Sequence, residues 1–165
     1  EIKEAFKLNR ILDIIPGGAD RQESAVNGLK RVRDKDSVVM VHDGVRPFVS
    51  HEVIEKVYAA ACENGAAITA VRSKDTIKVS DDGRKILKTL PREKLWAVQT
   101  PQAFNYELLL NAYELAEKDG FKATDDASVV EYSGHDVIIV EGSYSNIKIT
   151  TIEDLQYSEY LLNLQ

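Results

Sequence analysis

The chain has 165 residues, 44% of them hydrophobic and 29% charged, which is the balance of a globular domain with a substantial core. Its formal net charge of −6 argues against a broad basic surface for nucleic acid, so no nucleic-acid partner is expected. Because no signal peptide and no run of about 20 apolar residues is recognisable, we expect no membrane partner.

The first residues, EIKEAFKLN, have the pattern of an amphipathic helix and run directly into an apolar segment at 11–15 that reads as a strand. Few domains start in the middle of such a pattern, so we expect an upstream part of the protein before this chain. The loop PGGADRQ follows, and after it a helix at 24–33 with Ser24 as its N-cap.

Short apolar strands then alternate with helices. The next elements are a strand at 37–42, a helix at 51–63 after Ser50 and a strand at 66–72. This alternation favours an α/β sheet of parallel strands joined by helices over a sandwich or a bundle. The single cysteine, Cys62, cannot form an internal disulfide, so we expect a buried structural thiol in the reducing cytoplasm.

Residues 75–90 break this rhythm, because two alternating segments flank Asp82-Gly83. Asp-Gly at such a place is a strong signal for a β-hairpin. A two-stranded ribbon is only marginally stable alone. We therefore expect residues of about 75–92 to form a β-arm that packs on a second subunit of a homodimer.

The last third of the chain returns to strands and helices. The expected elements are a short strand at 96–100, a helix at 105–118, a helix from Asp125, a strand at 136–140, a short strand at 146–150 and a helix at 152–163. With no repeat, linker or low-complexity tract, residues 1–165 are interpreted as one domain with one projecting arm.

Polar residues follow the ends of the predicted strands, where open α/β sheets bind ligands. In the glycine loop after 11–15, Arg21 and Ser24 could bind oxygen atoms near a helix N-terminus, although a plain turn explains the loop as well. After the strand at 37–42, Asp43 and Arg46 could hold a hydroxyl or metal and a phosphate. The alternative is an Asp–Arg pair that only orders the loop.

Six motifs taken in order are more specific than any one of them. They are PGGADRQES, VHDGVRPF, KDTIK, PREKLWAVQTPQAF, TDDASVVEYSG and EGSYSNIKITTIEDL. Over essentially the whole chain this series resembles the 2-C-methyl-D-erythritol 4-phosphate cytidylyltransferases of isoprenoid-precursor synthesis. The resemblance implies a Rossmann-like nucleotidyltransferase fold, a homodimer joined by β-arms, and attack of the methylerythritol phosphate on the α-phosphorus of CTP with release of pyrophosphate.

The resemblance also implies roles for the residues of the first two motifs. Gly18, Arg21 and Ser24 match the cytidine pocket, with Gly18 and Ser24 at the base. Asp43 matches an acidic residue beside the sugar and the metal-phosphate centre. Arg46 matches a position that holds the methylerythritol phosphate.

The later motifs supply the remaining positions. Thr76 matches a second residue that holds the methylerythritol phosphate, and Arg92 and Lys148 match the pair that positions it for attack. In a homodimer, Thr76 and Arg92 are expected to serve the neighbour's site. Thr100 and Thr124 lie in matching motifs and are expected to line the same pocket.

Two anions must meet in this reaction, so cationic side chains and a divalent metal, Mg²⁺ by expectation, would offset their repulsion. The metal ligands are left open. A phosphate monoester is already a dianion near neutral pH, so little acid–base chemistry is needed. His42, His51 and His135 are accordingly expected to be structural.

The chain departs from the family in one respect, because no glycine-rich strand-turn segment with a following Pro-Lys motif is present. That segment grips the CTP triphosphate in the family, so this chain alone is expected to be inactive. Two alternatives stay open: a ribitol-5-phosphate cytidylyltransferase, and an inactive fragment that only dimerises. The motifs with Trp96 and with Asp125-Asp126-Ala127-Ser128 favour the methylerythritol enzyme over the ribitol enzyme.

Overall fold

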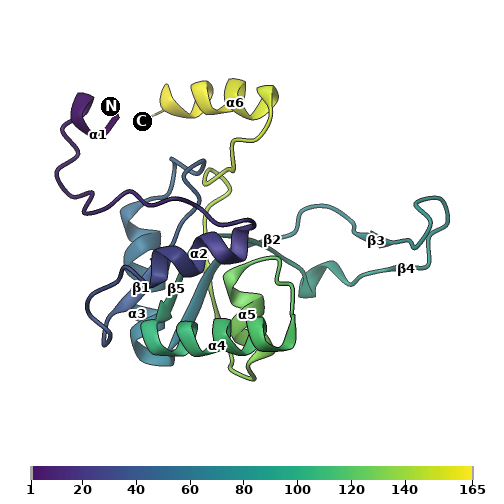
Figure 1. Ribbon diagram of the computed structural model, residues 1–165. Helices are drawn as coiled ribbons and strands as arrows, with labels where there is room; N and C mark the ends of the chain where they lie inside the picture. Colours follow the sequence, from purple (N-terminus) through teal and green to yellow (C-terminus); the bar gives the residue numbers. More distant parts are fainter. Residues whose placement is uncertain (1, 165) are drawn as a thin grey trace.

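Four strands form one sheet in the computed structural model, which describes residues 2–164 (Figure 1). In spatial order they are β1 (Val38–Val41), β5 (Trp96–Asn105), β2 (Ala66–Arg72) and β6 (Ile138–Glu141). β5 runs antiparallel to both of its neighbours, whereas β6 runs parallel to β2. The predicted mixture of helices with a layered sheet is confirmed. The all-parallel arrangement is wrong, because β5 lies between β1 and β2 and runs against both.

β5 is longer than the strand predicted at 96–100, since it continues past Pro101. Proline has no backbone N–H to donate to a neighbouring strand. The register between β2 and β5 shifts between Ile68 and Ala70, and this bulge accommodates the proline. The Pro101 carbonyl accepts a 2.8 Å hydrogen bond from the Thr69 hydroxyl.

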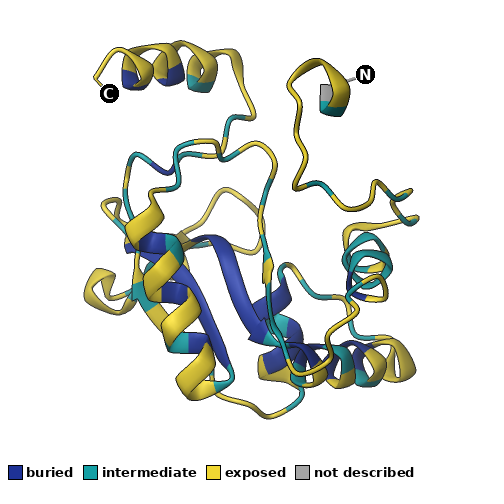
Figure 2. Cartoon of the chain, turned by 90° about the vertical axis from the view of Figure 1, so that its left-hand side faces the viewer, coloured by how far each residue is buried: buried dark blue, intermediate teal, exposed yellow. Residues whose placement is uncertain are grey.

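Helices cover both faces of the sheet and bury its central strands (Figure 2). The covering helices are α2 (Arg21–Leu29), α3 (His51–Asn64), α4 (Tyr106–Asp119) and α5 (Asp126–Tyr132). Ala67 packs with Val57 of α3 in one core, while its neighbour Ala66 belongs to a larger core with Leu109 of α4 and Val129 of α5. Successive side chains of a strand point to opposite faces, which explains why β2 is buried on both.

Side-chain caps begin the helices close to the predicted positions. Ser50, Asn105 and Asp125 accept hydrogen bonds from backbone N–H groups at the starts of α3, α4 and α5. Thr151 forms a capping box with Asp154 at the start of α6 (Ile152–Leu162). The remaining helices are the short α1 (Ile2–Ala5) and the 3₁₀ turn η1 (Arg92–Lys94). Within residues 2–164, every helix is too short or too polar to cross a membrane.

The predicted start of α2 is wrong, because the helix begins at Arg21 and its N-cap is Asp20 rather than Ser24. The Asp20 carboxylate accepts a 2.9 Å hydrogen bond from Glu23 N. Ser24 lies one turn inside the helix, and its hydroxyl donates to the Asp20 carbonyl. An aspartate is as good a cap as a serine, so the acid upstream set the start.

Two predicted strands are absent from the described structure. Residues 11–15 form no strand and pair with none, and Leu12 is 89% exposed. Residues 146–150 also lack a ladder, although Ile149 N donates to the Val45 carbonyl. An apolar run favours an extended backbone, but a strand also needs a partner. The predicted burial of Cys62 is wrong as well, since its position on α3 faces away from the sheet and is exposed.

The predicted hairpin is confirmed as a thin arm that projects from the sheet (Figure 1). β3 (Lys78–Val79) pairs antiparallel with β4 (Lys88–Thr89). At the turn, Gly83 has φ +70°, a conformation that glycine adopts without steric cost. The Asp82 carboxylate accepts hydrogen bonds from the backbone N–H groups of Arg84 and Lys85. The arm leaves Ile77, Ile86 and Leu87 exposed.

Candidate active site

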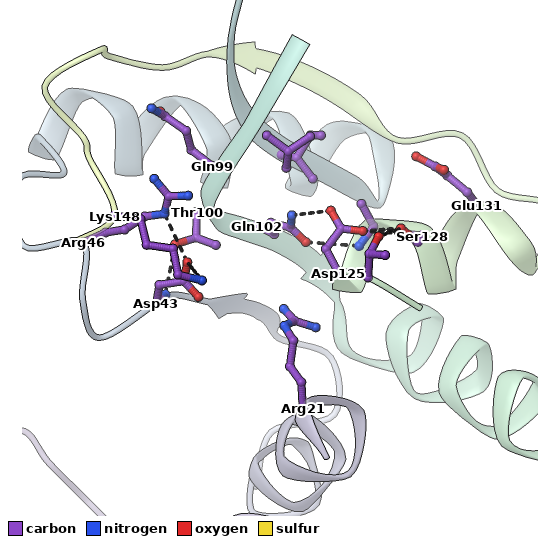
Figure 3. A pocket seen from close by; sticks show the side chains of 14 residues that line it. Arg21, Asp43, Arg46, Gln99, Thr100, Gln102, Asp125, Ser128, Glu131 and Lys148 are labelled. Carbon is purple, nitrogen blue, oxygen red and sulfur yellow. Dashed lines mark hydrogen bonds and ion pairs between the residues drawn. The ribbon is translucent and has the colours of Figure 1, made fainter. Parts of the chain in front are cut away.

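A cavity of about 450 Å³ opens beside β5 where several chain segments meet (Figure 3). These are the loop after β1, the N-termini of α2 and α5, and the segment before α6. The lining residues are Arg21, Asp43, Arg46, Ile68, Val98, Gln99, Thr100, Gln102, Thr124, Asp125, Ala127, Ser128, Glu131 and Lys148. Six predicted site residues are therefore brought together: Arg21, Asp43, Arg46, Thr100, Thr124 and Lys148.

Asp43 joins two cations at one end of this cavity. Its Oδ2 atom lies 3.1 Å from Arg46 Nε and 3.2 Å from Lys148 Nζ. Partial burial acts to raise the pKa of the Asp43 carboxyl, but hydrogen bonds and charge from Lys148 and Arg46 outweigh it and lower the pKa below the usual value. The Arg46 side chain is 11% exposed and that of Lys148 is 48% exposed. Arg46 is thus fixed in place, whereas Lys148 can reach a ligand.

Thr100 and His42 hold the turn that carries Asp43. The Thr100 hydroxyl accepts a 3.0 Å hydrogen bond from Asp43 N and lies 2.9 Å from His42 Nδ1. His42 Nε2 lies 3.1 Å from the Arg46 carbonyl. Since a carbonyl only accepts, Nε2 is the donor of this second contact. His42 therefore makes structural contacts in the turn, and Thr100 lines the cavity with its hydroxyl already engaged.

Arg21 reaches from α2 into the space between the Asp43 group and the Asp125 group (Figure 3). Its guanidinium donates to both carboxylate oxygens of Asp126, which is fully buried, and the Tyr113 hydroxyl donates to the same carboxylate. Burial acts to lower the pKa of Arg21, but its hydrogen bond and charge contact with Asp126 raise it overall. Burial first, and then the charge of Asp126, raise the pKa of Tyr113. This cluster fixes one cation at the cavity.

A second acid, Asp125, lies at the N-terminus of α5. It accepts a 2.9 Å hydrogen bond from Gln102 Nε2 of β5, and Gln102 Oε1 in turn accepts from Ala127 N. Burial acts to raise the pKa of the Asp125 carboxyl, but hydrogen bonds from Ser128 and Gln102 lower it overall. Thr124 Oγ1 lies 3.3 Å from Ser128 Oγ. Gln102 was not predicted, because one amide in an apolar strand carries no local signal of a role.

Gly18 and Ser24 do not line the cavity in this structure. Gly18 N donates a 2.9 Å hydrogen bond to Ser24 Oγ, which closes the loop before α2. A side chain on Gly18 would overlap Glu23, since its Cβ would lie 2.4 Å from two carbons of that residue. The loop thus requires glycine for steric reasons. The predicted contact of these two residues with a cytosine base stays a prediction.

Thr76 and Arg92 are also outside the cavity of their own chain. Both belong to the arm region, and Arg92 Nη1 donates a 3.1 Å hydrogen bond to the Lys74 carbonyl at the arm's base. The structure therefore does not join them to Asp43 and Lys148 within one chain. Their predicted service to a neighbouring subunit stays a prediction.

The Asp43 carboxylate is the group at its end of the cavity that could bind a metal ion. Among residues 2–164, no group of three or more His, Cys, Asp or Glu side chains is arranged to hold a metal by itself. Mg²⁺, however, is commonly held by one or two carboxylates together with substrate phosphates and water. The single carboxylate of Asp43 fits that mode of binding.

Comparisons with known sequences point to one family. The family model described as 2-C-methyl-D-erythritol 4-phosphate cytidylyltransferase matches residues 1–164. The protein of that name from Bacillus velezensis is 50% identical over 161 residues, which cover 97% of this chain and 68% of the relative. The one from Alkaliphilus oremlandii is 46% identical over 161 residues, which cover 98% of this chain and 68% of the relative.

Solved structures agree with the sequence comparisons. The 4-diphosphocytidyl-2C-methyl-D-erythritol synthase of Anaerococcus prevotii superposes with a TM-score of 0.85 at 37% identity, covering 99% of this chain and 78% of that one. The 2-C-methyl-D-erythritol 4-phosphate cytidylyltransferase of Thermus thermophilus gives a TM-score of 0.81 at 38% identity, covering 89% and 71%.

Proposed function

The chain belongs to the 2-C-methyl-D-erythritol 4-phosphate cytidylyltransferase family, and from this we propose that it transfers CMP from CTP to 2-C-methyl-D-erythritol 4-phosphate. The products are 4-diphosphocytidyl-2-C-methyl-D-erythritol and pyrophosphate, in the non-mevalonate pathway to isoprenoids. Family membership confirms the predicted resemblance, the cytidylyltransferase class and the nucleotidyltransferase fold.

One observation supports this reaction most directly: Arg46 and Lys148 meet at Asp43 on the wall of the cavity. A phosphate monoester that attacks a triphosphate brings two anions together, and fixed cations offset their repulsion. Lys148 is half exposed and would contact the phosphate of the polyol. Arg46 is held at two of its nitrogens and would offer its remaining N–H groups.

The nucleotide would lie on the side of the cavity away from Asp43, toward Asp125. Arg21 lies between these two acids, and because Asp126 already holds its guanidinium, it would not need to move when the nucleotide binds. Thr124 lies on the same wall. Gly18 and Ser24 shape the adjoining loop, so we keep them as residues that place the cytidine.

The metal that we propose for this reaction is Mg²⁺, with Asp43 as its protein ligand. When bound to the triphosphate, it would stabilise the negative charge that develops on the α-phosphorus and on the departing pyrophosphate. Asp43 has a lowered pKa and is therefore ionised near neutral pH. Its carboxylate would orient the metal-bound phosphates beside Arg46 and Lys148.

We further propose a cytoplasmic homodimer in which the arm of one subunit reaches the cavity of the other. Supporting this, the thin arm leaves Ile77, Ile86 and Leu87 exposed. Apolar side chains gathered on such a ribbon mark an interaction surface. In this arrangement Thr76 and Arg92 would complete the partner's polyol-phosphate site.

Turnover of two polyol phosphates tests the proposed substrate. Release of pyrophosphate from CTP is measured with methylerythritol phosphate and with ribitol 5-phosphate, and the Bacillus velezensis relative serves as reference. We expect kcat/KM to be at least about 100-fold higher for methylerythritol phosphate, because a site built on matched hydrogen bonds rejects an altered polyol strongly. Equal or higher efficiency with ribitol 5-phosphate would replace the proposal by its alternative.

A further inference from the structure

Two buried amide side chains connect β5 to the segment that carries Lys148. Asn146 is fully buried, and its Nδ2 donates a 2.8 Å hydrogen bond to the Thr100 carbonyl and a 3.4 Å bond to Gln99 Oε1. Gln99 is buried too, and its Nε2 donates to the Ser143 carbonyl at 2.9 Å and to the Asn146 carbonyl at 3.3 Å. The two amides therefore clamp the turn at 143–146 against the strand.

The same clamp holds Arg46. The Asn146 carbonyl, which accepts from Gln99, also accepts a 2.8 Å hydrogen bond from Arg46 Nη1. Two residues further along the chain, Lys148 reaches the Asp43 carboxylate that binds Arg46 Nε. A displacement of Asn146 would thus move one anchor of Arg46 and the backbone that carries Lys148.

One atom of the buried Asn146 amide has no partner in the described part of the chain. Its Oδ1 atom is buried and has no hydrogen-bond partner among residues 2–164. A buried acceptor without a partner is destabilising. An apolar side chain of similar size would avoid that cost, but it would leave the Thr100 carbonyl and Gln99 Oε1 without the donor that Asn146 Nδ2 gives them.

The chain next to Asn146 is shaped to meet Gln99. A Cβ atom on Gly142 would lie 2.5 Å from Gln99 Oε1 and 2.5 Å from Thr69 Cγ2. Both side chains are buried, so neither Gln99 Oε1 nor Thr69 Cγ2 can move aside freely. Only glycine lets the segment approach the strand closely enough for the clamp to close.

We propose that Asn146 is a positioning residue of the polyol-phosphate site, with Gln99 as its brace. Asn146 does not line the cavity, so it acts through the places that it gives to Arg46 and Lys148. This inference rests on the proposed function, since it assigns the two cations to the substrate phosphate. It predicts that loss of the clamp weakens use of the polyol phosphate and leaves use of CTP nearly intact.

The test compares Asn146→Leu with the parent enzyme in steady-state kinetics. We expect the KM for methylerythritol phosphate to rise at least about tenfold and the KM for CTP to change less than about threefold. Asn64→Leu is the matched control, because Asn64 is an exposed asparagine at the end of α3, and both constants should stay unchanged there. Equal KM values in Asn146→Leu and the parent, or an equal rise in both constants, would overturn the inference.

Two further variants separate positioning from general damage. Gln99→Met keeps the length of the side chain and removes both donor bonds, so the KM for methylerythritol phosphate should again rise while the KM for CTP changes little. This variant provides the test if Asn146→Leu does not fold. In an Arg46→Ala background, Asn146→Leu should raise the KM for the polyol phosphate by a smaller factor than it does alone. If Asn146→Leu raised this KM by the same factor with and without Arg46→Ala, Asn146 would not act through Arg46. If the parent enzyme fails to use methylerythritol phosphate at all, the proposed function fails instead.

Discussion

Lys148 Nζ lies 3.2 Å from Asp43 Oδ2, although the two residues are far apart in the sequence. The same carboxylate oxygen binds Arg46 Nε, so one negative charge holds two positive charges beside a cavity. Without that carboxylate the two cations would repel each other. Asp43 therefore determines both the spacing of the cations and the net charge that a phosphate would meet.

Asp43→Asn should reduce metal-dependent turnover by about 100-fold or more, because it removes a charge that organises the site. The amide keeps the size of the side chain, so the fold should persist. Asp13→Asn is the matched control, since Asp13 is a half-exposed acid in a 3.8 Å surface pair with Arg31. Pyrophosphate release at saturating Mg²⁺ measures the effect, and unchanged turnover in Asp43→Asn would exclude the proposed role.

Lys148→Ala should lower turnover by orders of magnitude and leave the melting temperature almost unchanged. The lysine is half exposed, and exposed ion pairs contribute little to stability. Lys56→Ala controls for loss of a surface ion pair, since Lys56 Nζ lies 2.6 Å from Glu52 Oε1. Thermal melts together with single-turnover assays check both halves of this prediction. An active variant, or one that is simply unfolded, would remove Lys148 from the proposed mechanism.

Tyr113→Phe should destabilise the protein by about 1–3 kcal/mol at neutral pH, because it removes a donor from the fully buried carboxylate of Asp126. For a protein of this size, each kcal/mol lowers the melting temperature by roughly 2–4 °C. Tyr132→Phe is the control, since Tyr132 donates to Asp119 at the surface. Equal melting temperatures for the two variants would contradict the buried role of Tyr113.

The difference between Tyr113→Phe and the parent protein should also depend on pH. Burial and the charge of Asp126 raise the pKa of Tyr113 in the folded state. A raised pKa means that the contribution to stability is complete below the unfolded pKa of about 10 and is lost as pH rises above it. Denaturant unfolding at pH 7 and at pH 11 should therefore show the stability gap shrinking at the higher pH. A stability difference that grows between pH 7 and pH 11 would contradict a raised pKa of Tyr113.

The sequence predicted those parts of the fold and site that have a local chemical signature. Ser50 and Asp125 mark helix starts because their side chains cap nearby N–H groups, and Asp82-Gly83 marks the arm because of its turn geometry. Asp43 was recognisable because it follows the apolar run at 38–41 closely and Pro47 comes soon after, a pattern that marks the end of a strand. In each case the cause lies within a few residues.

Features that depend on distant partners were not predictable in this way. Nothing near β5 in the sequence says that it lies between β1 and β2, so the sheet was expected to be parallel. Gln102 and Asn146 look like isolated amides until the fold brings Asp125 and Thr100 to them. Residues 11–15 have the apolar pattern of a strand without a strand to pair with.

The proposed dimer makes a sharper prediction. An Arg92→Ala protein and a Lys148→Ala protein should each be nearly inactive, but their mixture should regain activity after subunit exchange. If Arg92 of one chain serves the site of the other, each heterodimer has one intact site, because its good Arg92 and its good Lys148 come from different chains. Random pairing then restores roughly a quarter of the parent activity, since half of the dimers are heterodimers with one working site of two.

As a control, each variant is taken alone through the same exchange procedure at the same total concentration, and it should stay inactive. Light scattering on the same samples reports the oligomeric state, and a monomer at micromolar concentration would contradict the dimer directly. If scattering shows a dimer and the mixture still has no activity, each site is built from a single chain. In that case Arg92 would have to reach the cavity of its own chain, which requires the bond between Arg92 Nη1 and the Lys74 carbonyl to break and the arm's base to turn toward Asp43.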